Sequence, residues 1–272
     1  SWTVLIYANG NNELEPEITD TIEKLKLENI NDDFNIVIQL ARADKELVSK
    51  LRGNIESEEK DRWSGVRRYL INDKGIMEIE VLEDINMAEP RALYEFLLWG
   101  LENYPSNNVM VILSGHGAGF IGAMTDFTYD KPYIMTLDGL INVFYKLYEN
   151  TKKRIEVLLL DCCYMNLLEI WYEFSNIPFN PIKYLIVASD DVKIEGISYI
   201  HFIRYLQVKE KLYKENKKKL IDTINDFNSN DKLEDELSYC LDKFFKYNND
   251  ELFNVLVNDK DFKFVENIGL VR

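Results

Sequence analysis

Cysteine and histidine, the two residue types that together can hydrolyse a peptide bond, are scarce in this chain. Its 272 residues include the cysteines Cys162, Cys163 and Cys240 and the histidines His116 and His201. A thiol that faces an imidazole is activated toward the thiolate, which attacks a carbonyl carbon, and the imidazolium then protonates the leaving amine. Chemistry of this kind therefore has very few residues to draw on.

His116 lies in the segment GHGAG, directly after the apolar run VMVIL. Glycines on both sides leave an imidazole exposed on a turn and let a substrate backbone approach closely. The alternative is a turn histidine that only makes local hydrogen bonds, which is the commoner situation for an arbitrary His-Gly pair. The glycine-rich setting makes His116 a candidate acid/base residue.

Cys162 and Cys163 end the most hydrophobic run of the chain, EVLLLDCC. Since side chains alternate faces along a strand, we expect one thiol to be buried and the other to be presented beside the loop of His116. The alternative, a small apolar residue that packs well, should hold for one of the two. The backbone N–H groups of Gly117 and of the cysteine itself are candidates to hold an oxyanion.

The elements that must position these residues follow from apolar runs that alternate with helical patterns. Short, almost wholly apolar runs predict strands buried on both faces, at Thr3–Ala8, Phe34–Leu40, Val109–Leu113, Ile155–Leu160 and Tyr184–Ala188. Apolar residues at three- and four-residue spacing predict helices at Glu15–Glu28, Pro90–Tyr104, Leu137–Tyr148 and Leu167–Phe174. A hairpin or a pair of edge strands is expected at Gly65–Val81.

This alternation predicts an α/β fold, a three-layer αβα sandwich with a mostly parallel central sheet. Ligands bind at the carboxyl ends of such strands, and polar residues follow the predicted strands here. They include Asn9 to Asn12, Ser114, Asp161, Asp190 and Asp191. We assign residues 1–205 to a catalytic α/β domain and the charged helical residues 206–272 to a C-terminal cover or subdomain.

Composition excludes several classes of protein and partner. With 32 Lys and Arg against 47 Asp and Glu, the formal net charge is −15, which repels phosphate backbones and anionic lipids. Nucleic acid and membrane are therefore not expected as partners, and no apolar run approaches the length that spans a bilayer. Three cysteines without a CxxC pair exclude a disulfide scaffold, and two histidines make a His- and Cys-based zinc site hard to assemble.

Taken together, these segments resemble the clostripain-like cysteine peptidases, relatives of caspases, gingipains and legumains. The family pattern is an apolar strand ending in His-Gly, then one ending in Asp-Ala-Cys-Leu-Met; here they are VMVILSGHGAGF and EVLLLDCCYMN. The opening TVLIYANGNNELE resembles the family's first strand with its Asn-Asn-Leu-Glu loop, and INMAEPRALYEFLLWGLENYPSNNVMVIL its helix before the His strand. IVASDDVKIEGISY resembles its Ala-Ser-Glu segment, so the likeness covers roughly residues 3–199.

The resemblance implies a caspase-like fold and a cysteine endopeptidase that cleaves after Arg or Lys. It implies Cys163 as nucleophile and His116 as general base, with no third residue strictly required. Asp161 falls on an aspartate that lines the S1 pocket, where a carboxylate can bind a guanidinium bidentately, and Asp190 is implied as a second S1 acid. The alternative for Asp161 is a helix N-cap. Three positions depart from the family pattern: Phe120 stands for Trp, Cys162 for Ala and Ile197 for Trp. We expect these departures to change the fine substrate preference more than the chemistry.

Further expectations concern cofactors, location and maturation. The sequence requires no cofactor; some relatives use calcium, and the acids that could bind it are Asp126, Asp130, Asp190, Asp191 and Glu195. The chain starts at Ser1 without Met, so we expect it to have been trimmed. We also expect a bacterial protein that is secreted or on the cell surface and that acts as a monomer. Self-cleavage could occur in the loop 126–135, where Lys131 is the one basic residue after which the chain could be cut. Pro132, which follows it, makes cleavage at this bond unfavourable.

Three other functions are weighed against the peptidase. A catalytically silent relative would bind peptides or proteins through the same acidic groove, and selective alkylation of Cys163 would tell the two apart. A thiol phosphatase needs an Arg six residues after its cysteine, and that position is Glu169. A serine hydrolase would need a Gly-x-Ser-x-Gly elbow, which the chain lacks.

Overall fold

The computed structural model describes residues 1–53, 62–82, 85–188, 199–227 and 262–266. Within these ranges the strands are β1 (Trp2–Gly10), β2 (Phe34–Arg42), β3 (Gly65–Asn72), β4 (Gly75–Leu82), β5 (Asn108–Ser114), β6 (Gly122–Asp126), β7 (Tyr133–Thr136), β8 (Ile155–Asp161), β9 (Ile182–Ala188) and β10 (Phe262–Glu266). The helices are α1 (Glu15–Lys26), α2 (Lys45–Arg52), α3 (Pro90–Asn103), the 3₁₀ turn η1 (Gly119–Ile121), α4 (Leu137–Thr151), α5 (Leu168–Ser175) and α6 (Tyr199–Phe227).

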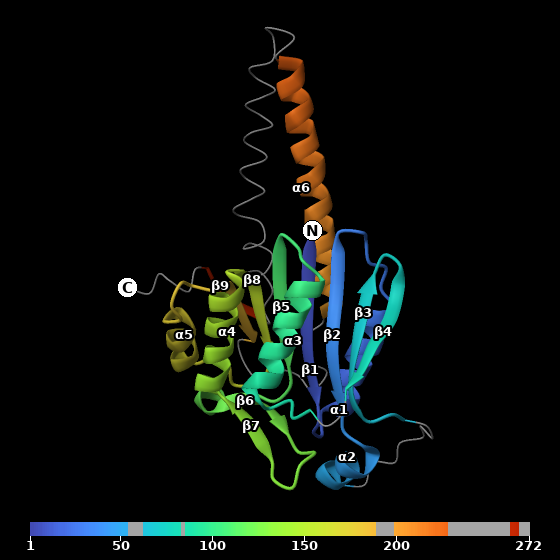
Figure 1. Ribbon diagram of the computed structural model, residues 1–272, viewed down its shortest axis with the longest axis vertical. Helices are drawn as coiled ribbons and strands as arrows, with labels where there is room; N and C mark the ends of the chain where they lie inside the picture. The colour runs from blue at the N-terminus through green and yellow to red at the C-terminus, as the bar shows by residue number, and fades with distance from the viewer. Residues whose placement is uncertain (54–61, 83–84, 189–198, 228–261, 267–272) are drawn as a thin grey trace. The chain divides into compact units, whose positions relative to one another are not determined.

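One large sheet with the strand order β10-β9-β8-β5-β1-β2-β3-β4 forms the centre of the fold (Figure 1). The strands β9, β8, β5, β1 and β2 are parallel to one another, and β3, β4 and β10 are antiparallel to their neighbours. The five parallel strands are the five that the apolar runs predict. Their continuous apolar character reflects burial on both faces of the sheet.

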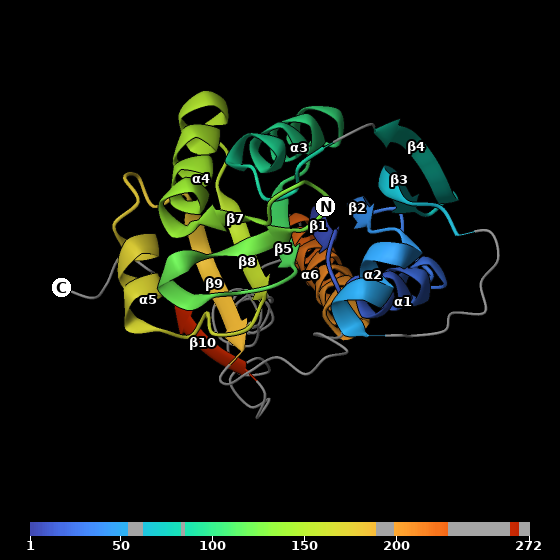
Figure 2. The same ribbon diagram turned by 90° about the horizontal axis from the view of Figure 1, so that it is seen from below.

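Helices cover both faces of this sheet. The helices α3 and α4 lie on the face opposite to α1 (Figure 2), and the core on their side also includes Ile170 and Phe174 of α5. On the other side α1 buries Ile18, Ile22 and Leu25. This layering confirms the predicted α/β class with a mostly parallel central sheet.

Local sequence signals explain where the helices next to the site begin and end. Pro90 begins α3, where its missing N–H would have no partner in any case. The Thr136 side chain caps α4 by accepting a 3.1 Å hydrogen bond from the Gly139 N–H. At the other end of α4, Lys152 adopts the left-handed conformation with φ 56° that commonly ends a helix.

The chain divides into two compact units, Ser1–Tyr199 with Asp261–Arg272, and Ile200–Lys260. In the second unit the described element is the charged helix α6. In the first, β10 pairs with β9 at the edge of the sheet, a strand that the helical interpretation of residues 206–272 did not include. Among the described residues, no helix is both long enough and apolar enough to cross a bilayer.

Candidate active site

Three neighbouring parallel strands end at the same level of the sheet and carry the candidate residues. Ala8 of β1 is the register partner of Ser114 of β5, and Ser114 is the partner of Asp161 of β8. His116 follows Ser114 by two residues, and Cys163 follows Asp161 by two residues. The Gly115 N–H donates a 3.3 Å hydrogen bond to the Asp161 carbonyl, so the segments that follow β5 and β8 stay paired where they leave the sheet.

The loop of His116 is held by a short hairpin that follows it. The Met124 N–H donates to the His116 carbonyl at 2.8 Å, and the Ala118 N–H donates to the Gly122 carbonyl at 2.8 Å. These bonds tie the glycine-rich turn to β6 and fix the main chain on both sides of Gly117. The segment GHGAG is therefore an ordered loop that presents a partly exposed imidazole.

The His116 imidazole lies against a carboxylate that the sequence did not single out. Nε2 of His116 is 3.0 Å from Oε1 of Glu13, and the two side chains are 29% and 34% exposed. The contact has the distance of an ion pair, but the ring is not aligned for a regular hydrogen bond. Interaction with His116 is the main cause that lowers the pKa of Glu13. The signal that could have revealed Glu13 is its place in the polar loop at the end of β1.

The two adjacent cysteines have different environments in the turn that follows β8. Cys162 is 1% exposed, and its Sγ lies 3.6 Å from the Leu113 carbonyl, to which it donates. Burial, followed by the charge of Asp161, raises the pKa of the Cys162 thiol well above its usual range. Cys163 is partly exposed, and the next residue, Tyr164, has φ 58°. Cys162 is therefore a packed, unreactive thiol, and Cys163 is the one presented outward.

Gly117 shows how closely the histidine loop packs on the cysteine turn. A Cβ atom on Gly117 would lie 2.0 Å from the Cys163 carbonyl oxygen and 3.0 Å from the Cys162 Cβ. Only a glycine fits there, which puts the residue next to His116 in direct contact with the backbone of Cys163. Gly117 and Ala123 face each other in a bridge whose bonds are made by flanking amides, so the Gly117 N–H has no partner among the described residues.

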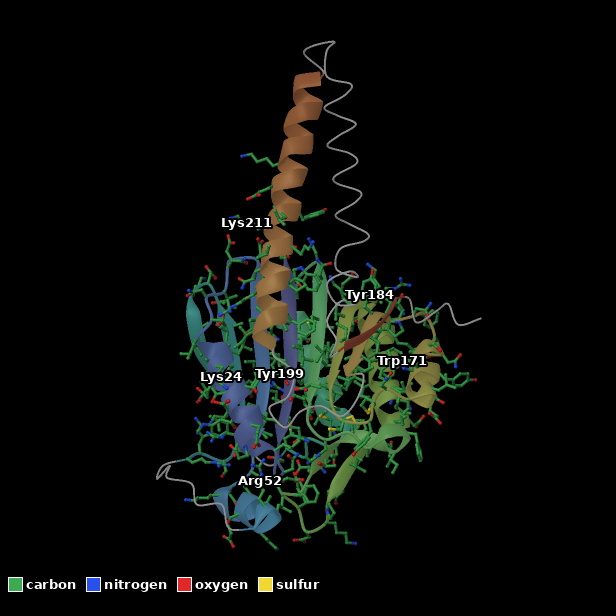
Figure 3. The ribbon with its side chains drawn as sticks, turned by 180° about the vertical axis from the view of Figure 1, so that it is seen from behind. Lys24, Arg52, Trp171, Tyr184, Tyr199 and Lys211 are labelled. Carbon is green, nitrogen blue, oxygen red and sulfur yellow. The ribbon has the colours of Figure 1, made fainter. Side chains whose placement is uncertain are left out.

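Asp161, the implied S1 acid, is buried beneath this turn and already accepts two hydroxyl groups. Its side chain is 5% exposed; Ser114 Oγ donates to Oδ2 at 3.1 Å, and the Tyr199 hydroxyl donates to the same oxygen. Burial and the nearby Asp161 raise the pKa of Tyr199 well above its usual range. Tyr199, labelled in Figure 3, is the residue at which α6 begins. Asp161 does not cap a helix, because α5 starts only at Leu168.

A buried polar network fixes the loop after β1. Asn11 Nδ2 donates to Asp126 Oδ2 at 2.7 Å, and Asn12 Nδ2 donates to the carbonyls of Asn9 and Thr125 at 3.1 and 3.0 Å. Asp126 Oδ2 also accepts the Met87 N–H at 2.9 Å. Asp126, one of the acids considered for calcium, thus anchors this loop to β6.

The remaining predicted residues fall partly outside the described ranges. Asp190, Asp191, Glu195 and Cys240 lie outside them, and the side chain of His201 does too. In the ranges that the structure describes, no group of three or more His, Cys, Asp or Glu side chains is arranged to hold a metal ion. Lys131 lies exposed between β6 and β7.

Comparison with known protein families identifies one that covers most of the chain. The sequence model of the clostripain family matches residues 6–252. A search of curated proteins gave no significant match.

Solved structures of similar fold include a secreted C11 cysteine protease from Bacteroides thetaiotaomicron with an irreversible peptide inhibitor (TM-score 0.54, 17% identity, 73% of this chain and 51% of that one). A second is an inactive zymogen C11 protease from Parabacteroides distasonis (TM-score 0.52, 17% identity, 73% and 51%). A third is the secreted C11 cysteine protease "iotapain" from Bacteroides thetaiotaomicron (TM-score 0.51, 17% identity, 76% and 57%). The chain thus spans little more than half the length of these proteins.

Proposed function

Because this chain belongs to the clostripain family, we propose that it is a cysteine endopeptidase that cleaves after Arg or Lys, with Cys163 as nucleophile and His116 as its acid/base partner. The observation that carries the proposal is the contact between Gly117 and Cys163, which brings the histidine loop onto the cysteine turn. Partial exposure of Cys163 beside a buried Cys162 supports the same choice of nucleophile.

The proposed reaction uses these groups in sequence. The Cys163 thiol passes its proton to the His116 imidazole, and the thiolate attacks the carbonyl carbon of the scissile bond. The N–H groups of Gly117 and Cys163 hold the developing oxyanion. The Gly117 N–H, which no described residue accepts, supports this role. The imidazolium then donates its proton to the leaving amine, and water hydrolyses the acyl-enzyme to release the second product.

The basic P1 preference is proposed from Asp161, with Asp190 as a second acid. The Asp161 carboxylate precedes the proposed nucleophile by two residues and is shielded from water, so a guanidinium that reached it would gain charge-assisted hydrogen bonds. In the structure this carboxylate accepts hydrogen bonds from the hydroxyl groups of Ser114 and Tyr199. Binding of a P1 side chain therefore requires the Tyr199 hydroxyl to move aside or to share the acid.

One set of assays tests this function. Wild type, Cys163→Ala and Cys162→Ala are compared on peptide reporters that differ only in Arg, Lys or Ala at P1. We expect wild type and Cys162→Ala to cleave the Arg and Lys reporters and Cys163→Ala to cleave none. A folded wild type that binds basic peptides without cleaving them would instead identify a catalytically silent relative.

We further propose that the protein acts as a secreted or cell-surface monomer with no obligatory cofactor. The first of the similar structures is described as a secreted protease. Activity that survives removal of divalent cations by EDTA, together with a monomeric mass in solution, is the expected result. Loss of activity in EDTA that calcium alone restores would contradict the proposal on the cofactor.

A further inference from the structure

Glu13 contacts the His116 ring from the end of a different strand. Its Oε1 lies 3.0 Å from Nε2 of His116. The contact joins the loop after β1 to the loop after β5, two neighbouring strands of the sheet. An imidazole that is engaged at Nε2 has Nδ1 left for proton exchange with a thiol.

Glu13 is held between two fully buried polar anchors. On one side, Asn12 is buried, and its Oδ1 accepts the Leu14 N–H at 2.9 Å, which spans Glu13. On the other side, Glu15 is buried and accepts Arg42 Nε at 2.7 Å and a second guanidinium from Arg62. Buried polar groups that are fully paired specify a unique local structure. The backbone that carries Glu13 is thus fixed before any substrate arrives.

The charges around Glu13 favour a carboxylate that interacts with the histidine. Arg52, on α2, adds a favourable charge, but its guanidinium is engaged by Glu17, to which Nη1 donates at 2.9 Å. The second oxygen of Glu13 is buried and has no hydrogen-bond partner among the described residues. His116 is therefore the principal partner of this carboxylate.

We propose that Glu13 is a positioning residue for His116: its carboxylate, with Oε1 3.0 Å from Nε2, attracts the Nε2–H and so favours the ring orientation in which Nδ1 faces the Cys163 thiol. The inference rests on the proposed function, which needs only Cys163 and His116. In the reaction the thiol proton moves to Nδ1 and then to the leaving amine, while the proton on Nε2 stays in contact with Glu13. A carboxylate in this place favours one tautomer and one orientation of the ring.

The competing interpretation is an ordinary surface ion pair. Such pairs contribute at most about 1 kcal/mol to stability and nothing to chemistry. A surface pair predicts that removal of Glu13 changes neither turnover nor the tautomer of His116. The two interpretations therefore differ in readouts that are independent of stability.

The first experiment compares Glu13→Ala, Glu13→Gln and the control Glu23→Gln on an Arg reporter. Glu23 lies on α1 and pairs with Lys26, so its change should leave kcat as in wild type. For Glu13→Ala we expect kcat to fall roughly ten- to a hundredfold with KM nearly unchanged, less than the loss in a fully buried triad. The amide oxygen introduced by Glu13→Gln can still accept the Nε2–H, so this variant should retain more activity than Glu13→Ala.

The second experiment measures the protonation of the imidazole directly. The chain has two histidines, so ¹⁵N-histidine NMR spectra are simple, and the His116 signals are those that disappear in His116→Gln. We expect neutral His116 in wild type to carry its proton on Nε2, and Glu13→Ala to lose this preference. An unchanged tautomer in Glu13→Ala overturns the proposal, even if kcat falls.

These readouts separate the two proposals. If wild type cleaves no reporter, the peptidase assignment fails, and the NMR comparison still decides whether Glu13 orients His116. If wild type is active and Glu13→Ala matches it in both kcat and tautomer, the peptidase stands and the role of Glu13 is refuted.

Discussion

Ser114 and Asp161 are register partners at the ends of two neighbouring parallel strands, and the Ser114 hydroxyl donates a 3.1 Å hydrogen bond to the Asp161 carboxylate. This pairing brings β5 and β8 to the same level, so the loops of His116 and Cys163 start side by side. Substitutions in these two loops therefore have specific expected outcomes.

Replacing Gly117 by alanine should disrupt the site. The added Cβ would lie 2.0 Å from the Cys163 carbonyl, so one of the two loops must shift. We expect a loss of stability of about 1–3 kcal/mol and a loss of most activity, measured by urea unfolding and reporter cleavage. Gly115→Ala is the matched control, because the nearest atom to its Cβ would be in the flexible end of Met124, at 3.3 Å. Equal effects of both changes would contradict this account of Gly117.

Asp161→Asn should change substrate preference more than turnover of neutral substrates. Loss of one charge-assisted hydrogen bond of about 1.5–3 kcal/mol corresponds to a roughly ten- to hundredfold lower kcat/KM for Arg and Lys reporters. The matched control is Glu156→Gln, also on β8, where the carboxylate forms an ion pair with Lys183. An unchanged ratio of Arg to Ala cleavage in Asp161→Asn would show that the preference comes from elsewhere.

The two adjacent thiols should differ in reactivity. Burial raises the pKa of Cys162, which therefore stays protonated near neutral pH, and its sulfur is out of reach of reagents. In a Cys240→Ser background, brief treatment with iodoacetamide should modify Cys163 alone, and Cys162 should react only after denaturation. Peptide mapping by mass spectrometry checks this. Modification of Cys162 in the folded protein would be inconsistent with the structure.

Glu13 should make a small, pH-dependent contribution to stability. Its pKa is lowered in the folded state, chiefly by His116, so the unfolded state binds the proton more readily. The contribution is present above the usual glutamate pKa of about 4.3 and is lost as pH falls through the lowered value. Because the pair is about a third exposed, we expect less than about 1 kcal/mol. Unfolding of wild type and Glu13→Gln between pH 6 and pH 3 should show the difference shrinking toward acid.

The sequence predicted the framework because burial leaves a strong signal. The apolar run at Val109–Leu113 became β5 (Asn108–Ser114), and the run at Ile155–Leu160 became β8 (Ile155–Asp161). Their order in the chain, with helices between them, was enough to predict parallel pairing and a common edge. The pattern at Pro90–Tyr104 likewise matched α3 (Pro90–Asn103).

Contacts between loops could not be predicted in the same way. Glu13 and His116 are far apart in sequence, and no periodicity links a loop carboxylate to a ring on another loop. The hydrogen bond from the Tyr199 hydroxyl to Asp161 is equally hard to predict, because it depends on how the chain returns to the sheet after β9. The charged pattern after Leu206 predicted a helix and matched α6, yet the pairing of β10 (Phe262–Glu266) with β9 left no recognisable trace in a segment rich in charge.

The most direct test of the central claim is covalent labelling by a peptide chloromethyl ketone that carries Arg at P1, which alkylates a thiolate with loss of chloride. Wild type and His116→Ala are incubated with the reagent, and the modified residue and its rate are determined by mass spectrometry. We predict that Cys163 is the residue modified in wild type, with a rate in His116→Ala lower by roughly a hundredfold or more. Labelling of Cys163 at the same rate without the imidazole, or cleavage of Arg reporters while Cys163 stays unmodified, would contradict the assignment.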